Sequence, residues 1–354
     1  MSEQPHAGQL KRGLALAGLA ALLFGMTAPL LKRASQGVGT FFAGALVYLG
    51  AAIAAALLAA ARASHERTTI PREARPRLLV VALLGAVVAP ALLVAGLRTV
   101  DSATASLLLA LEAPFTIALA RLLLREFVGG RVALAAAAIT AGAVVLIGTS
   151  SGSAVTLLGV LFVAAASLAW AGDNLLSRAL ADLDPLQVVA LKGLLGAVLS
   201  GVVAVATGDQ LPAPRNAGAL LLLGALGYGV SLQLYLRAQR LVGAARTASL
   251  FATAPFVGVA VAFSLGSAHL SMAFPVAAVL IGAGVVLHLS ERHEHAHRHA
   301  PLEHEHVHQH DDGHHDHVHD PMPAGPHSHP HVHQAVEHRH PHSEDIHHRH
   351  AHDG

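Results

Sequence analysis

Residues 102–124 read SATASLLLALEAPFTIALARLLL, a run in which apolar side chains predominate. A membrane-spanning helix needs about 20 such residues, because the hydrocarbon core is about 30 Å thick and each helical residue rises about 1.5 Å. Glu112 lies almost halfway along the run. An ionised carboxylate at that depth costs about 3 kcal/mol even on lenient insertion scales. The stretch therefore predicts a spanning helix with one acidic position at mid-depth.

Nine further runs of similar character accompany this one along the chain. The ten runs are Gly13 to Leu31, Phe41 to Ala61, Leu78 to Leu97, Ser102 to Leu124, Val132 to Gly148, Leu157 to Leu176, Leu186 to Ala206, Ala217 to Leu236, Ala244 to Leu265, and Met272 to Leu289. Consecutive apolar runs with short loops leave no polar face for water, which argues against the helices of a large soluble core. No small-residue cleavage site ends the first run, so we expect a retained helix rather than a signal peptide. We predict an all-α integral membrane protein with ten transmembrane helices.

The composition excludes several other classes of protein. Only 13% of the 354 residues are charged, whereas about a quarter are charged in soluble proteins. The absence of cysteine excludes disulfides, thiolate metal sites and a Cys nucleophile. The basic residues lack interleaved aromatic residues, which disfavours nucleic acid as a partner. No phosphate-binding loop, serine elbow or H-E-x-x-H motif is present, so nothing favours an enzyme.

Lys and Arg are unequally divided between the two sides of the predicted membrane. One side collects 15 of them, whereas the other holds only Lys32, Arg33, Arg98 and Arg215. Positive residues are retained on the cytoplasmic side of a membrane. Both termini are therefore predicted to be cytoplasmic.

Two segments of the chain repeat each other at a nearly constant spacing. Leu111-Glu112-Ala113-Pro114-Phe115 matches Ala252-Thr253-Ala254-Pro255-Phe256, and Ala141-Gly142-Ala143-Val144-Val145 matches Ala283-Gly284-Val285-Val286-Leu287. The offsets between the two matched pairs differ by a single residue. Matches in the same order at one spacing indicate an internal duplication.

Each copy of the duplication would hold five spans. Since five is an odd number, the second copy must enter the membrane from the opposite side, which gives two inverted five-helix repeats. In secondary transporters this symmetry supports alternating access to a site near the midplane. A duplicated bundle that serves only as a scaffold or a receptor is the other interpretation.

The two halves share further short motifs, which are the aromatic-small pairs Phe24-Gly25 and Trp170-Ala171, Glu112-Ala113-Pro114, and the Ala-Gly endings of the fifth and tenth spans. With these motifs, the duplicated pattern resembles the EamA family of the drug/metabolite transporter (DMT) superfamily. The resemblance covers about residues 13–289 and implies export or exchange of amino acids, other small metabolites or drugs across a bacterial-type inner (cell) membrane. The family's frequent Gly-Glu pair after spans four and nine is Arg125-Glu126 and Gly266-Ser267 here.

This resemblance and the composition predict four regions. Residues 1–12 form a cytoplasmic N-terminus, 13–148 the first EamA-like five-helix repeat, 157–289 the second, and 290–354 a His-rich cytoplasmic tail.

Glu112 and Pro114 are the main candidates for a substrate or coupling site. Pro114 has no N–H, so the carbonyl of Ala110 loses its helical donor and the backbone opens there. A polar pocket at mid-depth could bind a substrate amine or a proton; alternatively, a protonated carboxyl caps a distorted turn. Thr253 and Pro255 take the equivalent places in the second repeat.

Residues of the sixth to eighth spans supply further candidates. Asp173 and Lys192 can approach each other across a helix hairpin, either as a cytoplasmic gate or as a structural ion pair. Pocket walls are predicted by residue type alone, and the aromatic ones could instead lie at the membrane interface. These substrate or coupling candidates are Trp170, Asn174, Tyr228 and Gln233, with Tyr235, Phe251 and Phe256 as further wall candidates.

The tail differs from the rest of the chain in composition. It holds 23 of the 27 histidines and a net charge of −8, from 4 basic and 12 acidic residues, whereas residues 1–290 carry +9, from 19 and 10. So polar and proline-rich a segment is predicted to be disordered. Its H-x-H units are typical of Zn, Ni or Co binding, although a solvated or pH-responsive extension fits equally. The predicted metal ligands are His293, His295, His297, His299, His304, His306, His308, His310, His314, His315, His317, His319, His327, His329, His331 and His333.

These observations favour an exporter of a small organic metabolite or drug that works by alternating access and carries a metal-binding cytoplasmic tail. A divalent-metal (Ni, Co or Zn) exporter, or a metal-regulated efflux protein, is the alternative. The expected partners are the lipid bilayer, a small-molecule substrate and divalent metal ions. No cofactor is required.

Overall fold

A computed structural model describes residues 7–61, 70–149, 154–180, 183–267, 272–289, 293–298, 302–308, 327–333 and 337–342. The chain divides into two compact units, Met1–Ser290 and Glu291–Gly354. The first unit is helical and the second contains strands, and each is described by itself below.

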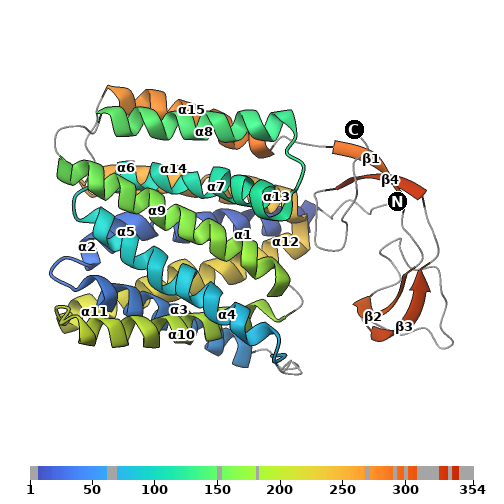
Figure 1. Cartoon of the computed structure of the whole chain (residues 1–354), viewed down its shortest axis with the longest axis horizontal. Helices are drawn as coiled ribbons and strands as arrows, with labels where there is room; N and C mark the ends of the chain where they lie inside the picture. The colour runs from blue at the N-terminus through green and yellow to red at the C-terminus, as the bar shows by residue number, and fades with distance from the viewer. Residues whose placement is uncertain are drawn as a thin grey trace. The chain divides into compact units, whose positions relative to one another are not determined.

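The helices of the first unit form two sets that follow each other along the chain (Figure 1). The first set is α1 (Ala7–Gly25), α2 (Thr27–Ala34), α3 (Thr40–Ala60), α4 (Ala74–Ala82), η1 (Leu83–Val88), α5 (Ala89–Leu97), α6 (Ser102–Leu108), η2 (Leu109–Leu111), α7 (Glu112–Leu119), η3 (Ala120–Leu124) and α8 (Gly130–Thr149). The second set is α9 (Ala154–Ser177), η4 (Arg178–Leu180), α10 (Pro185–Ala206), α11 (Pro214–Gly224), η5 (Ala225–Val230), α12 (Ser231–Val242), α13 (Ala244–Phe251), α14 (Ala254–Ser264) and α15 (Ala273–Leu289). Segments η1, η3 and η5 are π-helical, whereas η2 and η4 are 3₁₀-helical.

Within the described residues, nine helical segments are long and apolar enough to cross a membrane by length and composition. They are Gly8–Ala34, Thr40–Ala60, Ala74–Leu97, Ser102–Leu124, Gly130–Gly148, Thr156–Leu180, Pro185–Ala206, Pro214–Val242 and Arg246–Ser264. The tenth predicted span is the shorter apolar helix α15. The prediction of an all-α, multi-pass membrane protein is confirmed for the first unit.

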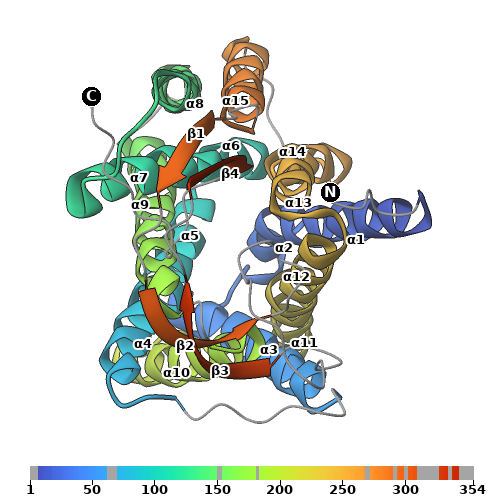
Figure 2. The same cartoon turned by 90° about the vertical axis from the view of Figure 1, so that its right-hand side faces the viewer.

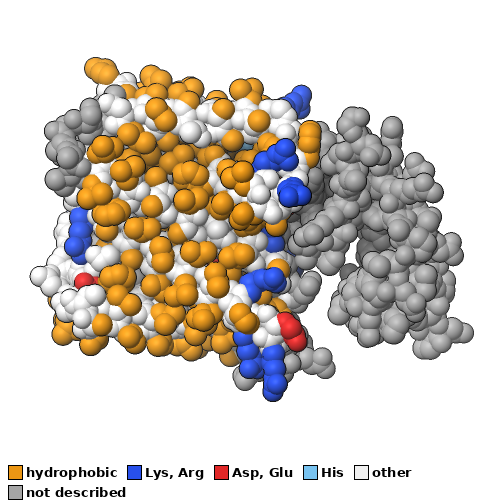
Figure 3. All heavy atoms as spheres, in the orientation of Figure 1, with side chains coloured by type: hydrophobic (Ala, Val, Ile, Leu, Met, Phe, Trp, Pro, Cys, Tyr) orange, Lys and Arg blue, Asp and Glu red, His pale blue; other side chains and the backbone are white. Residues whose placement is uncertain are grey.

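The outer surface of the helical unit suits a bilayer. Large apolar side chains such as Leu57, Leu122, Val202 and Val279 are more than half exposed. On the face drawn in Figure 3, apolar side chains cover the flank of the helices, and Lys and Arg gather toward the helix ends. Apolar surface of this extent is stable only against lipid or another apolar surface.

The two helix sets pack against each other with an internal two-fold symmetry. Helix α1 packs against α12, and its counterpart α9 packs against α5 in the same way. Helix α3 pairs with α10, and α8 pairs with α15. These two pairs lie at opposite edges of the unit when it is viewed along the helices (Figure 2). Each pairing thus maps onto itself or onto its counterpart when the two repeats are exchanged.

The pair of α8 and α15 carries this symmetry to single residues. A Cβ on Gly142 of α8 would lie 2.9 Å from the Ala277 carbonyl oxygen, and a Cβ on Gly284 of α15 would lie 2.8 Å from the Ala135 carbonyl oxygen. The two glycines are separated by the same offset along the chain as the two alanines. Small residues let the two helix backbones approach and gain dispersion contacts that lipid cannot supply.

Irregular turns recur at equivalent places in the two repeats. The π-helical segments η1 and η5 start at Leu83 and Ala225, which are separated by the same offset as Gly142 and Gly284. The fourth and ninth spans are also interrupted at matching positions, just before Glu112 and at Thr253. Pro114 lies two residues after Glu112, and Pro255 two residues after Thr253. Proline interrupts the hydrogen bonds of a helix because it has no N–H. These two irregularities are therefore repeated along with the helices, whereas η3 has no π-helical counterpart in α14.

The second unit contains four short strands in two antiparallel pairs. Strand β1 (His293–Arg298) pairs with β4 (Glu337–His342), and β2 (Leu302–His308) pairs with β3 (His327–His333). In the first pair, His293, His295 and His297 stand opposite His342, His340 and His338. The sequence predicts disorder for the whole tail, whereas these four segments form strands. The predicted ligands His299, His310, His314, His315, His317 and His319 lie outside the described residues.

Candidate functional site

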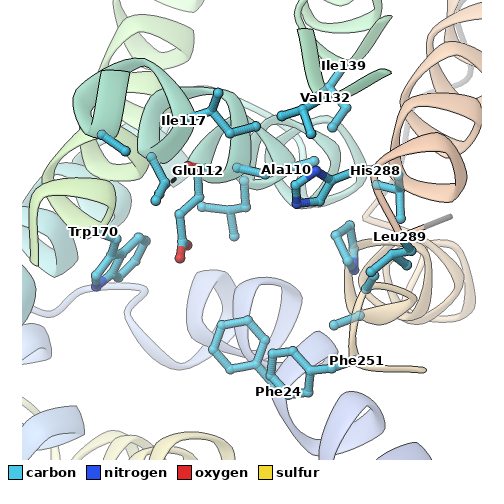
Figure 4. Close-up of a pocket in the computed structure, with 18 of the residues that line it drawn as sticks. Phe24, Ala110, Glu112, Ile117, Val132, Ile139, Trp170, Phe251, His288 and Leu289 are labelled. Carbon is cyan, nitrogen blue, oxygen red and sulfur yellow. Dashed lines mark hydrogen bonds between the residues drawn. The ribbon is translucent and has the colours of Figure 1, made fainter. Parts of the chain in front are cut away.

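A cavity of about 460 Å³ lies in the helical unit between the two repeats. The lining is mostly apolar, with a few polar side chains. Figure 4 shows Glu112, Trp170, Phe24, Phe251 and His288 arranged around a common space. Its wall consists of Phe24, Thr27, Leu109, Ala110, Glu112, Ala113, Thr116, Ile117, Ala120, Glu126, Phe127, Val128, Val132, Ile139, Trp170, Arg178, Tyr228, Phe251, Ala252, Ala254, Pro255, Val285, His288 and Leu289. An apolar cavity with few polar groups is typical of a small-molecule site.

Glu112 enters this cavity from the irregular turn in the fourth span. The backbone tightens into the 3₁₀ turn η2 directly before Glu112, which is the first residue of α7. The side-chain amide of Asn174, on α9, donates a hydrogen bond to Oε1 of Glu112 over 2.5 Å. A carboxylate in apolar surroundings needs such a partner, since it is otherwise left without the hydrogen bonds of water. The acid of the first repeat is therefore held by an amide of the second.

Aromatic rings form one wall of the cavity. The ring of Phe24 lies edge-on to Tyr228, with centroids 5.7 Å apart, and its centroid is 5.2 Å from that of Phe251. These three side chains come from α1, η5 and α13. Stacked and edge-on rings present both apolar surface and negative π-faces, which attract organic cations.

Trp170 connects the cavity wall to the first π-helical turn. Its indole Nε1 donates a hydrogen bond to the carbonyl of Gly85 over 3.0 Å, and the Tyr48 hydroxyl donates to the same carbonyl. Gly85 belongs to η1. A π-helical turn changes the helical hydrogen-bond pattern, so that a carbonyl becomes accessible to side chains. The irregularity thus links α3 and α9 through one backbone oxygen.

Asp173 and Lys192 form an ion pair directly beside this turn. Lys192 Nζ on α10 donates to Oδ2 of Asp173 on α9, and Ser177 Oγ donates to Oδ1 of Asp173 over 3.3 Å. The side chain of Asp173 is 3% exposed and that of Lys192 is 18% exposed. A Cβ on Gly85 would overlap both partners of the pair. The predicted approach of the two residues is therefore confirmed, whereas their role as a gate stays a prediction.

One end of the cavity reaches the helix ends that carry Arg178 and His288. Arg178 Nη1 lies 2.6 Å from Oε1 of Glu126 and joins the two repeats there. The Nδ1 atom of His288 is buried without a hydrogen-bond partner among the described residues. No group of three or more His, Asp or Glu that could hold a metal ion occurs in the part of the chain that the structure describes.

The opposite end of the unit is bridged by polar contacts between helix ends and loops. Lys32 Nζ donates to the carbonyl of Val100 over 2.5 Å, and the backbone N–H of Ser102 donates to the carbonyl of Ser267 over 3.3 Å. Oδ2 of Asp209, in the loop before α11, accepts a hydrogen bond from the N–H of Phe41 over 2.7 Å. The last two contacts join one repeat to the other, so the repeats are tied together at this end.

The structure brings some of the predicted site residues together and separates others. Glu112, Trp170, Tyr228 and Pro255 line the cavity, and Asn174 bonds to Glu112. Pro114 is buried in α7 and is not part of the wall. Thr253 does not line it either, because its hydroxyl turns back to the carbonyl of Leu250 over 2.6 Å.

Gln233 is also absent from the cavity wall, because it is buried in α12 at 4% exposure. Sequence reasoning in turn missed Phe24, Thr27, His288 and the ion pair of Glu126 with Arg178. The position of Phe24 early in the first span marks the repeat but gives no indication of a role in the site. His288 could have been found as the one histidine inside a predicted span.

Comparisons with known proteins agree with this architecture. The model of the EamA-like transporter family matches the chain twice, over residues 11–148 and 157–290. No match was found among curated proteins. A solved structure described as "Crystal structure of protein" is similar in fold, with a TM-score of 0.58 and 22% sequence identity, and the match covers 78% of this chain and 98% of that one.

Proposed function

The chain belongs to the EamA-like transporter family, and we propose that it exports a small organic metabolite or drug by alternating access. It is a multi-pass membrane protein of the drug/metabolite transporter superfamily. The observation that carries the proposal is the cavity between the repeats, which is lined by Glu112 from the middle of the fourth span and by aromatic residues. A site shared by two inverted halves can be opened to either side when the halves exchange conformations.

The cavity suits an organic solute with an amine and an apolar body. Glu112 supplies a carboxylate that can accept hydrogen bonds from an ammonium group or bind a proton that competes with it. Phe24, Trp170, Tyr228 and Phe251 supply ring faces for cation–π contact and apolar packing. A volume of about 460 Å³ is within the range of small-molecule sites.

The orientation of the transporter follows from its charges. The 15 Lys and Arg residues on the side of the termini favour a cytoplasmic location for both ends of the chain. Arg178 and His288, at one end of the cavity, belong to that side. The bridges at Lys32, Ser102 and Asp209 belong to the other. This conformation would then receive a solute from the cytoplasm of a bacterial-type inner membrane, as an exporter does before it releases the solute outside.

Flux measurements in reconstituted vesicles test this function. The protein is assayed with a panel of radiolabelled aromatic amines and amino acids, as wild type, Glu112→Gln and Glu73→Gln. Loss of a hydrogen bond to a charged group costs about 1.5–3 kcal/mol, so Glu112→Gln should lower flux by about 10- to 100-fold. Glu73→Gln is the matched control, because Glu73 is exposed before α4 and does not line the cavity. Unchanged flux in Glu112→Gln would refute the role of Glu112, and no flux of any compound would favour a scaffold or receptor.

The tail adds a divalent-metal site to this proposal. Its histidines recur at every second residue in units such as His293-Glu294-His295 and His304-Glu305-His306. Neutral imidazole nitrogens are suitable ligands for divalent transition metals such as Zn and Ni. The metal is an accessory ligand in this proposal, and the organic solute is the cargo.

Deletion of residues 291–354 separates the accessory role from metal export. Growth and intracellular metal content under Ni, Co and Zn challenge are compared for the full chain, the deletion and Glu112→Gln. The deletion should abolish metal binding by the purified protein while organic flux persists. If the deletion also lowers metal tolerance and Glu112→Gln does the same, the metal itself is the cargo and the organic-solute proposal is wrong.

A further inference from the structure

A second cavity of about 570 Å³ lies between the first and eighth spans. It is a groove along the seam between α1 with α2 from the first repeat and α11 with η5 from the second. Its lining residues are Leu23, Met26, Leu30, Arg33, Ala34, Gln36, Arg215, Asn216, Ala219, Leu222, Leu223, Leu226 and Gly227. None of them lines the cavity that contains Glu112.

The groove faces the lipid rather than the interior of the bundle. Leu222 and Leu226 in its wall are 59% and 38% exposed, and Ala219 is exposed as well. Leu19 and Leu22, on the neighbouring surface of α1, are 44% and 42% exposed. Since exposed leucines on a membrane-spanning helix contact acyl chains, the groove opens to the bilayer.

Polar residues occupy only one end of the groove. Arg215 lies at the start of α11, and Gly227 lies further along the same span, in η5. At the helical rise of about 1.5 Å per residue, these two residues are about 18 Å apart along the axis. That length is close to half of the roughly 30 Å hydrocarbon core. The apolar part of the groove is therefore about as long as one leaflet of the bilayer, and the polar residues lie at one end of it.

The polar end is positively charged and joins the two repeats. Arg33 comes from α2 and Arg215 from α11, both are exposed, and the lining residues named above include no acid. The side-chain amide of Asn216 donates to the carbonyls of Ala34 and Gln36 over 3.1 and 2.9 Å. This contact holds the ends of α2 and α11 together beside the two arginines.

We propose that this groove binds an anionic phospholipid of the bilayer. The lipid phosphate pairs with Arg33 and Arg215, whose guanidinium groups bind phosphate through paired hydrogen bonds. One acyl chain lies along Leu30, Leu223 and Leu226. Charge at one end and one leaflet of apolar wall fit a phospholipid, whereas a soluble phosphate would leave the apolar wall unused.

Such a lipid would stabilise the conformation described above. Its headgroup contacts one arginine of each repeat, at the end where the loops already bridge the repeats. Separation of α2 from α11 would break one of the two contacts. A phospholipid in the groove therefore favours the state in which this end is closed.

Binding of phosphatidylglycerol to the detergent-purified full chain tests the proposal. The affinity is measured by the rise in thermal midpoint as phosphatidylglycerol is titrated in, with phosphatidylcholine and inorganic phosphate as comparison ligands. The variants are Arg33→Gln/Arg215→Gln, the charge-retaining Arg33→Lys/Arg215→Lys, and Ala219→Trp, which fills the apolar part. Arg237→Gln/Arg240→Gln is the matched control, because it removes two arginines from the other end of the same span.

The proposal expects a specific pattern of losses. Each arginine contributes about 1 kcal/mol toward an anionic headgroup, so the double Gln variant should bind phosphatidylglycerol about 30-fold more weakly. Ala219→Trp should also bind it more weakly, whereas the matched control should keep the wild-type affinity. The Lys variant keeps both charges but loses the paired hydrogen bonds, so its affinity should lie between those of the wild type and the double Gln variant. Equal affinity in the double Gln variant and the wild type would overturn the proposal. So would an equal response to inorganic phosphate, or full binding by Ala219→Trp.

Discussion

The amide of Asn174 and the carboxylate of Glu112 lie 2.5 Å apart and join the two repeats at the cavity wall that Glu112 lines. Glu112 lies in the fourth span, and Asn174 in the sixth, directly after the ion-paired Asp173. One end of α9 thus contacts both Glu112 in the cavity and Lys192 on α10. A substitution that disrupts one of these contacts should therefore also affect the other.

Replacement of Asn174 by Leu should weaken transport without unfolding the protein. Glu112 would lose its donor, and a hydrogen bond to a charged group is worth about 1.5–3 kcal/mol. We expect flux in vesicles to fall by about 10-fold, with partial recovery in Asn174→Gln, which keeps an amide. Thr140→Val is the control, because that exposed hydroxyl bonds to the carbonyl of Ala136 in its own helix. Equal flux in Asn174→Leu and wild type would contradict the prediction.

The ion pair of Asp173 and Lys192 should behave as a coupled unit. Removal of one partner leaves the other charge buried and unpaired, which costs about 3–5 kcal/mol. We expect Asp173→Asn and Lys192→Met each to lower the thermal midpoint strongly in detergent. The double variant should be more stable than the sum of the two losses predicts. Purely additive losses in stability and flux would show that the pair is not coupled.

Alanine at Gly85 should disturb the same ion pair from the other side. A Cβ there would overlap Asp173 and Lys192 in a closely packed region. We expect Gly85→Ala to cost about 1–3 kcal/mol of stability and to lower flux. The control is Gly201→Ala on α10, where a Cβ meets nothing within 4 Å. A Gly85→Ala protein as stable as Gly201→Ala would argue against the tight contact.

Replacement of Arg125 by glycine should make the protein more stable. It follows η3 with φ of 56°, in the left-handed region, whereas Gly266 adopts φ of 65° after the ninth span. A side chain in this region costs about 1 kcal/mol relative to glycine. Arg125→Gly should therefore raise the thermal midpoint, and Gly266→Ala should lower it. A lower midpoint for Arg125→Gly would mean that the exposed guanidinium contributes more than the backbone strain costs.

The spans and their duplication could be predicted from the sequence because both depend on many residues. A run such as Ser102 to Leu124 is recognised by its apolar length alone. The match of Glu112-Ala113-Pro114 to Thr253-Ala254-Pro255 can be seen in the sequence without the structure. The ion pair was predictable as well, since Asp173 and Lys192 are the opposite charges of neighbouring spans.

The details of the site were less predictable because they depend on rotation about the helix axis. Thr253 is equivalent to Glu112 in sequence, yet its hydroxyl bonds to the carbonyl of Leu250 and it does not line the cavity. Gln233 is polar and within a span, yet it is buried away from the cavity wall. The π-helical turn at Gly85 changes which side chains face inward, and periodicity alone does not reveal it.

The reciprocal contacts of Gly142 with Ala277 and of Gly284 with Ala135 have the form of an isologous dimer interface. The same patch serves on both sides, so a gene for one half alone could encode both surfaces. Two such half-length proteins could form this seam only if they inserted with opposite topologies. Fusion into one chain guarantees one copy in each orientation and lets the copies diverge, which is how a single ancestral position can now hold Glu112 in one half and Thr253 in the other.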